Sequence, residues 1–463
     1  MKSPDILTSM TFEELGLSDA LIKAVKVAGY VTPTEIQLEA IPRILAGKDV
    51  LGCAQTGTGK TAAFAMPTIQ RLNKTSLRPP RGGKNKSRRG IVHELRCLVL
   101  APTRELAGQI SENFREYAHF TRLRQTVIFG GVSAKPQVQR LQRGVDILIA
   151  TPGRLLDLHG KGHLDLGQVQ TLIIDEADML FDMGFIRDLE RIVKLTPPKR
   201  QTLLFSATIP AEVQQQAAKW LRNPDAIDIT PEAIPIKLIN QKIYFVERDV
   251  KDQMLIQYLC STPRGRTMVF VRTRMDADRV GRNLTKVGLT AVSLHGEKAQ
   301  AKRKRAITDF KSDVPPILVA TDVAARGLDI SSVSHVINYA VPEFPEIYIH
   351  RVGRTGRAGA KGEAITLCCS DERYHLGRIE ELVDMKLPTA EWPFEDFPDL
   401  PHLEKAYHRK KTGHDPRRKQ RWEKRSTGKH GGNSESKGRK PKKKRKSRGK
   451  AITQKDIQAN KRG

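Results

Sequence analysis

Short apolar segments alternate with longer stretches of helical length along most of the chain. The segments are rich in Val, Ile and Leu, and their length is typical of strands. Strands separated by helix-length segments form parallel sheets covered by helices. The pattern therefore predicts an α/β fold. The strand candidates are 49–53, 95–101, 125–131, 145–150, 171–175 and 201–207, then 242–246, 267–271, 291–296, 316–322, 334–340 and 363–368.

The two series of strand candidates predict two tandem domains. Between them lies a stretch with two prolines and no helical period, which is typical of a flexible linker. Near the end of the chain the apolar periodicity stops, and a Lys/Arg/Gly/Ser-rich stretch that cannot bury a core follows. The predicted divisions are an N-terminal lead (1–37), a first domain (38–225), a linker (226–238), a second domain (239–390), a disordered tail (391–463) and a mobile surface insert (77–90).

The positive charge of the chain is concentrated in two segments. The formal net charge is +29; residues 404–463 contribute +19 of it, and the insert adds six basic residues without an acidic one. The remaining residues carry a formal charge of only +4. Basic segments of this kind favour a nucleic-acid partner over a simple solubilising role.

Cysteine usage and hydropathy exclude several protein classes. The five cysteines form no CxxC pair and none lies near a histidine at metal-ligand spacing, which is typical of reduced thiols in a cytosolic protein. The N-terminal residues contain no apolar signal region, and no run of 18 apolar residues occurs. We therefore expect neither secretion nor a membrane span.

The segment AQTGTGKT follows a predicted strand and precedes an apolar helical stretch. Such a glycine-rich turn points backbone N–H groups at a phosphate, at the positive end of the helix dipole. The ammonium group of Lys60 is expected to reach the β- and γ-phosphates, and the Thr61 hydroxyl to bind Mg²⁺. The strict pattern begins with glycine, but alanine is small enough for the turn. The predicted phosphate loop comprises Ala54, Gln55, Thr56, Gly57, Thr58, Gly59, Lys60 and Thr61.

Three carboxylates follow the predicted buried strand at 171–175, in the segment LIIDEADML. Buried negative charge is costly unless cations offset it, and a nucleotide site with Mg²⁺ and Lys60 supplies them. Asp175 is expected to hold Mg²⁺ through a water, and Glu176 to polarise the water that attacks the γ-phosphate. Asp178 is expected to couple nucleotide state to the domain by hydrogen bonds to the SAT segment, at Ser206 and Thr208.

The second series of strands carries the motif HRVGRTGR. Arginines at a spacing of three beside glycines suit bidentate phosphate contacts. We expect Arg354 and Arg357 to act as arginine fingers in the nucleotide site of the first domain, with His350 beside the water. Such a finger contributes on the order of 10³–10⁵ in rate in related phosphoryl transfers.

In this order, the motifs closely resemble those of the DEAD-box ATP-dependent RNA helicases, over about residues 10–390 and most like the bacterial members. The resemblance implies two RecA-like domains. GYVTPTEIQ resembles the Q motif, so Gln37 would read the adenine edge, and Phe12 would pack near the base with Tyr30. Glu35 stands where the family has proline. Asp329 would touch the ATP ribose.

The remaining resemblances imply contacts to the RNA backbone. PTREL, GG and TPGR resemble motifs of the first domain; VFVRTR, QAKR and ATDVAARGLD resemble motifs of the second. Contacts to phosphates and 2′-hydroxyls carry no sequence information, so the core would bind RNA by its backbone. The residues implicated are Pro102, Thr103, Arg104, Gly131, Thr151, Gly153, Arg154, Arg272, Arg303 and Thr321.

The expected activity is RNA-dependent ATP hydrolysis that locally parts short RNA duplexes or remodels RNA–protein complexes, with ATP and Mg²⁺. Domain closure on ATP and RNA would be the switch. One alternative is a related DNA helicase or translocase, against which DEAD and TPTEIQ argue. Another is an RNA-annealing chaperone dominated by the tail, against which the intact hydrolytic motifs argue.

The sequence also indicates a setting for this activity. A monomer in the bacterial cytoplasm that acts in ribosome assembly or RNA turnover, with ribosomal precursors as possible partners, fits the resemblance best. The basic run 441–446 is also compatible with a nuclear localisation signal, but we interpret it as an RNA-binding cluster.

Overall fold

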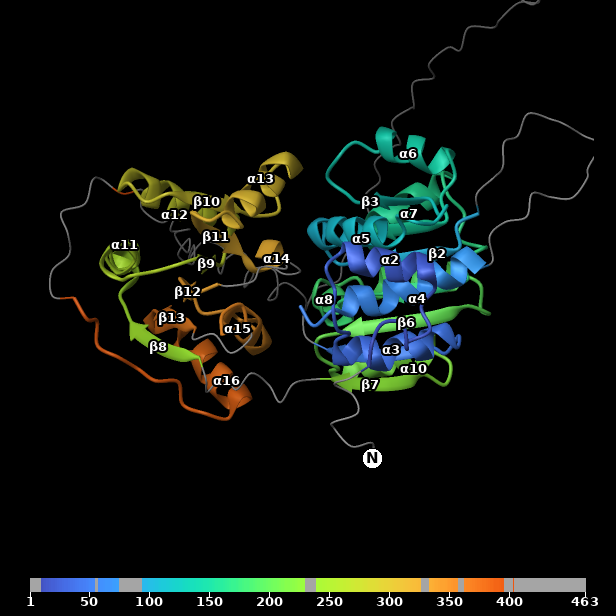
Figure 1. Cartoon of the computed structure of the whole chain (residues 1–463). Coiled ribbons are helices and arrows are strands. Elements are labelled where there is room, and N and C mark those ends of the chain that lie inside the picture. The colour runs from blue at the N-terminus through green and yellow to red at the C-terminus, as the bar shows by residue number, and fades with distance from the viewer. Residues whose placement is uncertain are drawn as a thin grey trace, which may run out of the picture. The chain divides into compact units, whose positions relative to one another are not determined.

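The computed structural model describes residues 10–54, 57–74, 94–229, 239–325, 333–356, 362–394 and 403. These residues contain two parallel β-sheets flanked by helices (Figure 1). We call residues 10–229 the first domain and residues 239–394 the second domain. All of the predicted strand segments form strands, which confirms the fold class of two tandem α/β domains.

The first domain has a seven-stranded sheet in the order β3-β4-β2-β5-β6-β1-β7, with all neighbours parallel. Its strands are β1 (Val50–Ala54), β2 (Cys97–Leu100), β3 (Gln125–Ile128), β4 (Ile147–Ala150), β5 (Thr171–Ile174), β6 (Gln201–Ser206) and β7 (Asp225–Ile229). Its helices are α2 (Asp19–Val27), α3 (Glu35–Leu45), α4 (Lys60–Lys74), α5 (Arg104–Tyr117), α6 (Lys135–Gln142), α7 (Pro152–Gly160), α8 (Ala177–Asp182), α9 (Ile186–Leu195) and α10 (Ala211–Trp220).

The second domain has a six-stranded sheet in the order β10-β11-β9-β12-β13-β8, again with parallel neighbours. Its strands are β8 (Asn240–Phe245), β9 (Thr267–Val271), β10 (Ala291–Leu294), β11 (Ile317–Thr321), β12 (His335–Asn338) and β13 (Glu363–Cys368). Its helices are η2 (Arg248–Val250), α11 (Lys251–Ser261), α12 (Arg274–Lys286), α13 (Gln300–Phe310), α14 (Asp322–Ala325), α15 (Pro345–Val352), η4 (Ser370–Glu372) and α16 (Arg373–Val383).

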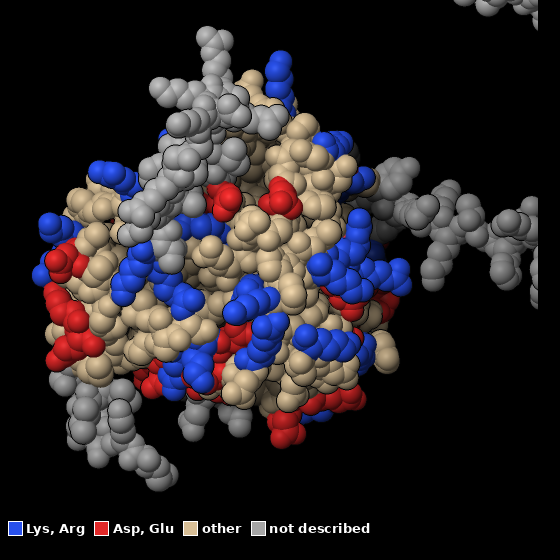
Figure 2. Space-filling model, turned by 90° about the vertical axis from the view of Figure 1, so that its right-hand side faces the viewer, with Lys and Arg blue, Asp and Glu red and all other residues tan. Residues whose placement is uncertain are grey.

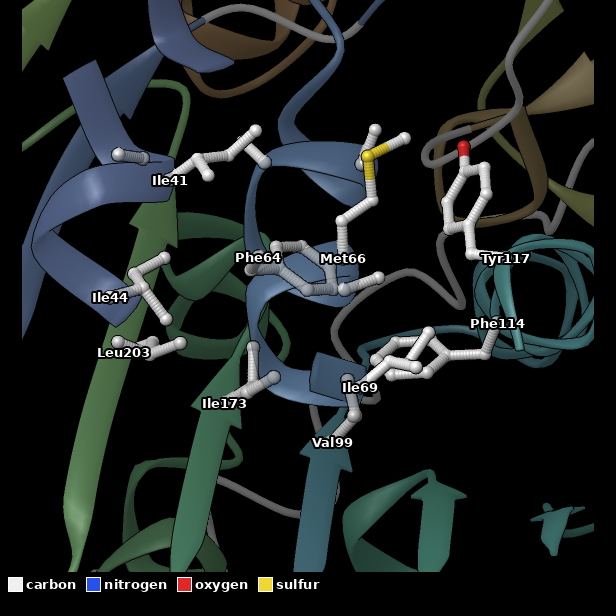
Figure 3. Packing of buried hydrophobic residues seen from close by; sticks show 14 of the residues in the cluster. Ile41, Ile44, Phe64, Met66, Ile69, Val99, Phe114, Tyr117, Ile173 and Leu203 are labelled. Atoms are coloured by element: carbon white, nitrogen blue, oxygen red, sulfur yellow. The ribbon is translucent and has the colours of Figure 1, made fainter. Parts of the chain in front are cut away.

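Helices cover both faces of the first sheet, which is why its central strands β2, β4 and β5 are buried at every position. Alternate residues of one strand join different cores: Val99 packs with α3, α4 and α5, whereas Leu98 and Leu100 pack on the opposite face. Figure 3 shows side chains of α3, α4 and α5 gathered over Val99, Ile173 and Leu203. This two-sided burial fixes the strand ends, where the candidate site lies.

Two of the expected boundaries need correction. The linker was expected from 226, but β7 occupies Asp225–Ile229 and pairs in parallel with β1, so the first sheet continues to residue 229. The tail was expected from 391, but Trp392 packs edge-on against the ring of Tyr244 at a centroid distance of 4.9 Å. The Trp392 indole N–H also donates to the side-chain oxygen of Gln257 at 2.7 Å. An aromatic body with one polar atom suits such an anchor.

The insert, residues 230–238 and the basic tail at 404–463 lie outside the described residues. Over the face that Figure 2 draws, basic and acidic residues of the described part are interspersed rather than segregated. This distribution agrees with the small formal charge left once the tail and insert are set aside. No helix among the described residues is long and apolar enough to cross a membrane.

Candidate functional site

The predicted phosphate loop falls between the end of β1 and the start of α4. Gly57 and Gly59 have φ values of +89° and +91°, a backbone conformation that side-chain-bearing residues rarely adopt. A Cβ atom on Gly59 would collide with the side chain of Gln37. Gln55 and Thr56 lie outside the described residues. The glycines therefore permit both the turn and the close approach of Gln37.

The side chain of Gln37 is buried and braces this loop. Its amide nitrogen donates to the carbonyl of Gly59 at 3.3 Å, and its amide oxygen accepts from the backbone N–H of Thr34 at 3.0 Å. Gln37 thereby closes a capping box at the start of α3. The predicted adenine reader is thus tied to the phosphate loop.

A buried cation and two buried carboxylates lie at the carboxyl ends of the strands of the first sheet. Lys60 is 6% exposed, and no described residue offers a hydrogen-bond partner to its Nζ atom. Asp175 and Glu176 are 2% and 6% exposed, and they line the same cavity of about 350 Å³ as Lys60 and Thr61. A buried ammonium group that lines a cavity and makes no hydrogen bond is an expected anchor for an anion. The residues present fit a bound nucleotide phosphate.

Burial raises the pKa of Glu176 to about 7; the neighbouring Asp175 adds to the shift, and Lys60 and Arg354 oppose it. Burial also raises the pKa of Asp175, with Lys60 opposing. A carboxylate that titrates near neutrality can both accept and release a proton at physiological pH.

Glu176 also has an unusual backbone. Its φ and ψ of 50° and 57° lie in the left-handed region, at the N-cap of α8, and its N–H donates to Asp175 Oδ1 at 3.0 Å. Strain of this kind clusters at functional sites.

The expected hydrogen bonds between Asp178 and the SAT segment are present. The Asp178 N–H donates to the Ser206 hydroxyl at 3.1 Å. Asp178 Oδ2 accepts from the N–H and the hydroxyl of Thr208 at 3.0 and 2.9 Å. The end of β6 is therefore fastened to the first turn of α8, which carries the acidic motif.

Two tyrosines form the aromatic side of the cavity, and Phe12 packs next to one of them. Phe12 is 2% exposed and stacks against Tyr30 at a centroid distance of 6.5 Å; its contact with the base stays a prediction. Tyr30 is 39% exposed and lines the cavity. Tyr117 of α5 lines it too, and the sequence analysis did not identify this residue. No local motif marks Tyr117, because its neighbour Tyr30 is 87 residues away.

The predicted RNA-binding residues of the first domain meet at one edge of its sheet. Pro102, Thr103 and Arg104 follow β2, Gly131 follows β3, and Thr151, Gly153 and Arg154 follow β4. The side chain of Arg104 lies directly against Gly131, where a Cβ would collide with it. The Arg154 guanidinium donates to the carbonyl of Val132 at 2.9 Å. Parallel strand order alone brings these motifs together.

In the second domain, the two predicted arginines already have protein partners. Arg272 donates to Glu372 at 3.0 Å and to the carbonyl of Val341 at 3.2 Å. The buried guanidinium of Arg303 forms an ion pair with Glu105 at 2.6 Å. Thr321 ends β11.

The motif HRVGRTGR begins in α15. His350 and Arg354 line a small pocket with Arg351, which the sequence analysis did not single out. Arg351 is paired with Asp322 at 2.5 Å and with Asn338 at 3.1 Å, so it holds α15 against the sheet. The predicted residues Arg357 and Asp329 lie outside the described residues.

Comparisons with known proteins agree with this geometry. Residues 34–216 match the family described as DEAD/DEAH box helicase, and residues 250–359 match the helicase conserved C-terminal domain. The chain is 40% identical over 392 residues to ATP-dependent RNA helicase CshA of Limosilactobacillus reuteri, covering 83% of this chain and 75% of that protein. It is 40% identical over 383 residues to DEAD-box ATP-dependent RNA helicase RhpA of Helicobacter pylori (strain B128), covering 83% and 74%.

A solved structure is similar as well. Saccharomyces cerevisiae Dbp5 bound to RNA and ADP BeF3 is 29% identical, with a TM-score of 0.71 over 83% of this chain and 96% of that one. The likeness therefore extends over both sheets.

Proposed function

Because the chain belongs to the DEAD-box family of ATP-dependent RNA helicases, which hydrolyse ATP to unwind RNA, we propose that Lys60 and Glu176 are the centre of its hydrolytic site. One observation supports this assignment most directly. The buried Nζ atom of Lys60 has no hydrogen-bond partner among the described residues and lines one cavity with Asp175 and Glu176. The phosphates of a nucleoside triphosphate would supply hydrogen-bond acceptors and negative charge to this ammonium group.

Magnesium is the expected companion of the nucleotide. Thr61 and, through a water, Asp175 would hold it together with phosphate oxygens. The described residues contain no cluster of three His, Cys, Asp or Glu side chains that could hold a metal ion. The ion supplies charge neutralisation on the transferring phosphoryl group.

The residues of the chain divide the remaining work. Glu176 orients the attacking water and takes its proton, for which a pKa near 7 is suited. Arg354, Arg357 and His350 act on the same phosphate from the second domain, which makes hydrolysis depend on domain closure. The bonds from Asp178 to Ser206 and Thr208 transmit nucleotide state to the end of β6.

RNA binding by the core is assigned to the residues at the carboxyl ends of β2, β3 and β4 and to their counterparts in the second domain. Backbone N–H groups and arginines there suit phosphates and 2′-hydroxyls, so the core reads no sequence. Because Arg303 is paired with Glu105 in this structure, RNA must compete with that carboxylate for its guanidinium group.

The test is the ATPase rate of wild type and Glu176→Gln with RNA, with single-stranded DNA and without nucleic acid. We expect RNA to stimulate the wild type strongly. Glu176→Gln should lose at least about a hundredfold in rate yet retain ATP-dependent RNA binding. Glu212→Gln, on the exposed first turn of α10, is the matched control and should behave as wild type. Equal stimulation by DNA, or a fully active Glu176→Gln, would contradict the assignment.

We further propose that the basic tail at 404–463 tethers RNA near the core without choosing a sequence. The proposed setting is the bacterial cytoplasm, with the protein as a monomer acting on ribosomal RNA precursors; the bacterial relatives support it. Crosslinking in cells followed by sequencing of the bound RNA tests the target. Enrichment of mRNA without ribosomal precursors would point to RNA turnover instead.

A further inference from the structure

Helix α5 connects two predicted binding regions of the first domain. It spans 14 residues, which corresponds to about 20 Å. Its N-terminus carries Thr103 and Arg104, two of the residues assigned to the RNA backbone, and its last residue is Tyr117. Leu106, Gln109, Asn113 and Tyr117 follow one another at spacings of three or four, so one face of the helix lines the nucleotide cavity from end to end.

The hydroxyl of Tyr117 is joined to the hydroxyl of Tyr30 at 2.9 Å. Tyr117 is 1% exposed, and its ring belongs to the core of the first domain. Figure 3 shows the Tyr117 hydroxyl directed away from the apolar side chains of Phe114 and Ile69. A buried hydroxyl needs a partner, and Tyr30 provides it. Burial and this hydrogen bond raise the pKa of Tyr117, so the hydroxyl keeps its proton at physiological pH.

The segment that contains Tyr30 holds its backbone but not its ring. Tyr30 lies between α2 and α3, after Gly29, whose φ is +75°, and its N–H donates to the carbonyl of Val25 at 3.1 Å. Its ring is held by Phe12 behind it and by Tyr117, at a centroid distance of 6.2 Å and an interplanar angle of 53°. These contacts orient the half-exposed Tyr30 ring that faces the cavity.

We propose that Tyr117 is a positioning residue that fixes Tyr30 for the purine base and couples base binding to RNA binding through α5. A base stacked on Tyr30 favours the position of α5 in which the two hydroxyls meet. RNA at Thr103 and Arg104 favours a position of the same rigid helix, whose Ile110 and Phe114 are fully buried. Two ligands that favour the same position of one element raise each other's affinity. This inference rests on the proposed nucleotide site.

The decisive variant is Tyr117→Phe, which keeps the ring and removes the hydroxyl. Losing one such hydrogen bond corresponds to about a threefold to tenfold effect. We expect the KM for ATP to rise by that factor while kcat at saturating ATP and RNA changes little. Inhibition by ADP should weaken to the same extent, whereas inhibition by pyrophosphate, which lacks a base, should not. The gain in affinity for single-stranded RNA caused by a non-hydrolysable ATP analogue should fall by about threefold.

Two further variants keep the test specific. Tyr30→Phe should reproduce the effect, and the double variant should add nothing, because both changes remove the same bond. Tyr374→Phe, at an exposed tyrosine of the second domain, should be silent. An unchanged KM in Tyr117→Phe, equal losses for ADP and pyrophosphate, or additive effects would each overturn the inference. If Glu176→Gln loses turnover while Tyr117→Phe is unchanged, the inference fails and the proposed function stands.

Discussion

Two buried lysines, each following a parallel strand at the carboxyl edge of its sheet, have opposite surroundings. Lys60 of the first domain has no hydrogen-bond partner for its Nζ atom among the described residues. Lys251 of the second domain donates to the carbonyl of Tyr339 at 2.8 Å and to Glu372 at 2.7 Å. Their exposed fractions are 6% and 4%, so burial does not distinguish them.

The difference separates a ligand site from a structural network. A buried charged group that makes no hydrogen bond is unfavourable, and it persists in a protein where a ligand supplies the missing hydrogen bonds. In the second domain the charges complete one another: Glu372 accepts from both Lys251 and Arg272, and Arg279 pairs with Asp252. Ion pairs of this kind hold the strand ends in place, and Arg272, predicted to bind RNA, belongs to them.

The largest expected effect comes from exchanging the two lysines for methionine separately. Lys60→Met should lower ATPase activity by at least about a hundredfold, because it removes a cation at the phosphates. Its stability should change little, because the Lys60 Nζ atom makes no hydrogen bond among the described residues and acts on Asp175 and Glu176 only through its charge. Lys251→Met should lose about 3 kcal/mol of stability, because it leaves Glu372 with one cation fewer.

Urea unfolding and RNA-stimulated ATPase assays on both variants measure these outcomes. The control is the affinity of Lys251→Met for ADP, measured without urea; it should equal that of the wild type. A Lys60→Met protein that unfolds more easily than Lys251→Met would reverse the comparison between a ligand site and a structural network.

The next effect is a pH dependence that belongs to the first site. Glu176 must be deprotonated to accept a proton, so kcat/KM for ATP should rise with pH through about 7. The folded-state pKa of Glu176 is raised above its ordinary value of 4.5, so the folded protein binds an extra proton between pH 4.5 and about 7. The stabilising contribution of this proton is present below about 4.5 and is lost as the pH rises through about 7.

Glutamine does not ionise, so Glu176→Gln does not lose stability as the pH rises through about 7. Its free energy of unfolding relative to wild type should therefore increase from pH 5 to pH 8, by on the order of 3 kcal/mol at most. Glu372→Gln is the matched variant in the second domain. It should destabilise at pH 8, because two cations lose a shared carboxylate. A relative stability of Glu176→Gln that does not change with pH would contradict the raised pKa.

The smallest effects distinguish the anchored end of the second domain from the tail that follows it. Trp392→Ala should cost about 2 kcal/mol of stability, because the ring packs on Tyr244 and bonds to Gln257, and the affinity for RNA should not change.

Deleting residues 404–463 should have the opposite effects. The affinity for RNA should fall and its salt dependence should flatten, while stability and the ATPase rate at saturating RNA should not change. Titrations at several salt concentrations together with calorimetry test both, and a tail deletion with an unchanged salt slope would contradict the tether.

The sequence alone predicted both sheets, the glycine-rich turn between β1 and α4, the acidic motif after β5 and the bonds from Asp178 to Ser206 and Thr208. These features can be predicted because each depends on a few contiguous residues at the end of a strand. Parallel strand order then brings those ends to one edge of the sheet. The same locality explains the two misplaced boundaries: neither β7 nor the Trp392 anchor carries a local signal that identifies its distant partner.

Tertiary structure alone decided which polar groups are satisfied. It placed Tyr117 beside Tyr30 and buried Phe12 against the Tyr30 ring. It left Lys60 Nζ without a hydrogen-bond partner among the described residues, whereas Lys251 Nζ has two. Each of these facts depends on contacts between residues far apart in the chain. Strand and turn patterns arise from neighbouring residues, whereas the surroundings of a buried charge arise from whatever the fold packs against it.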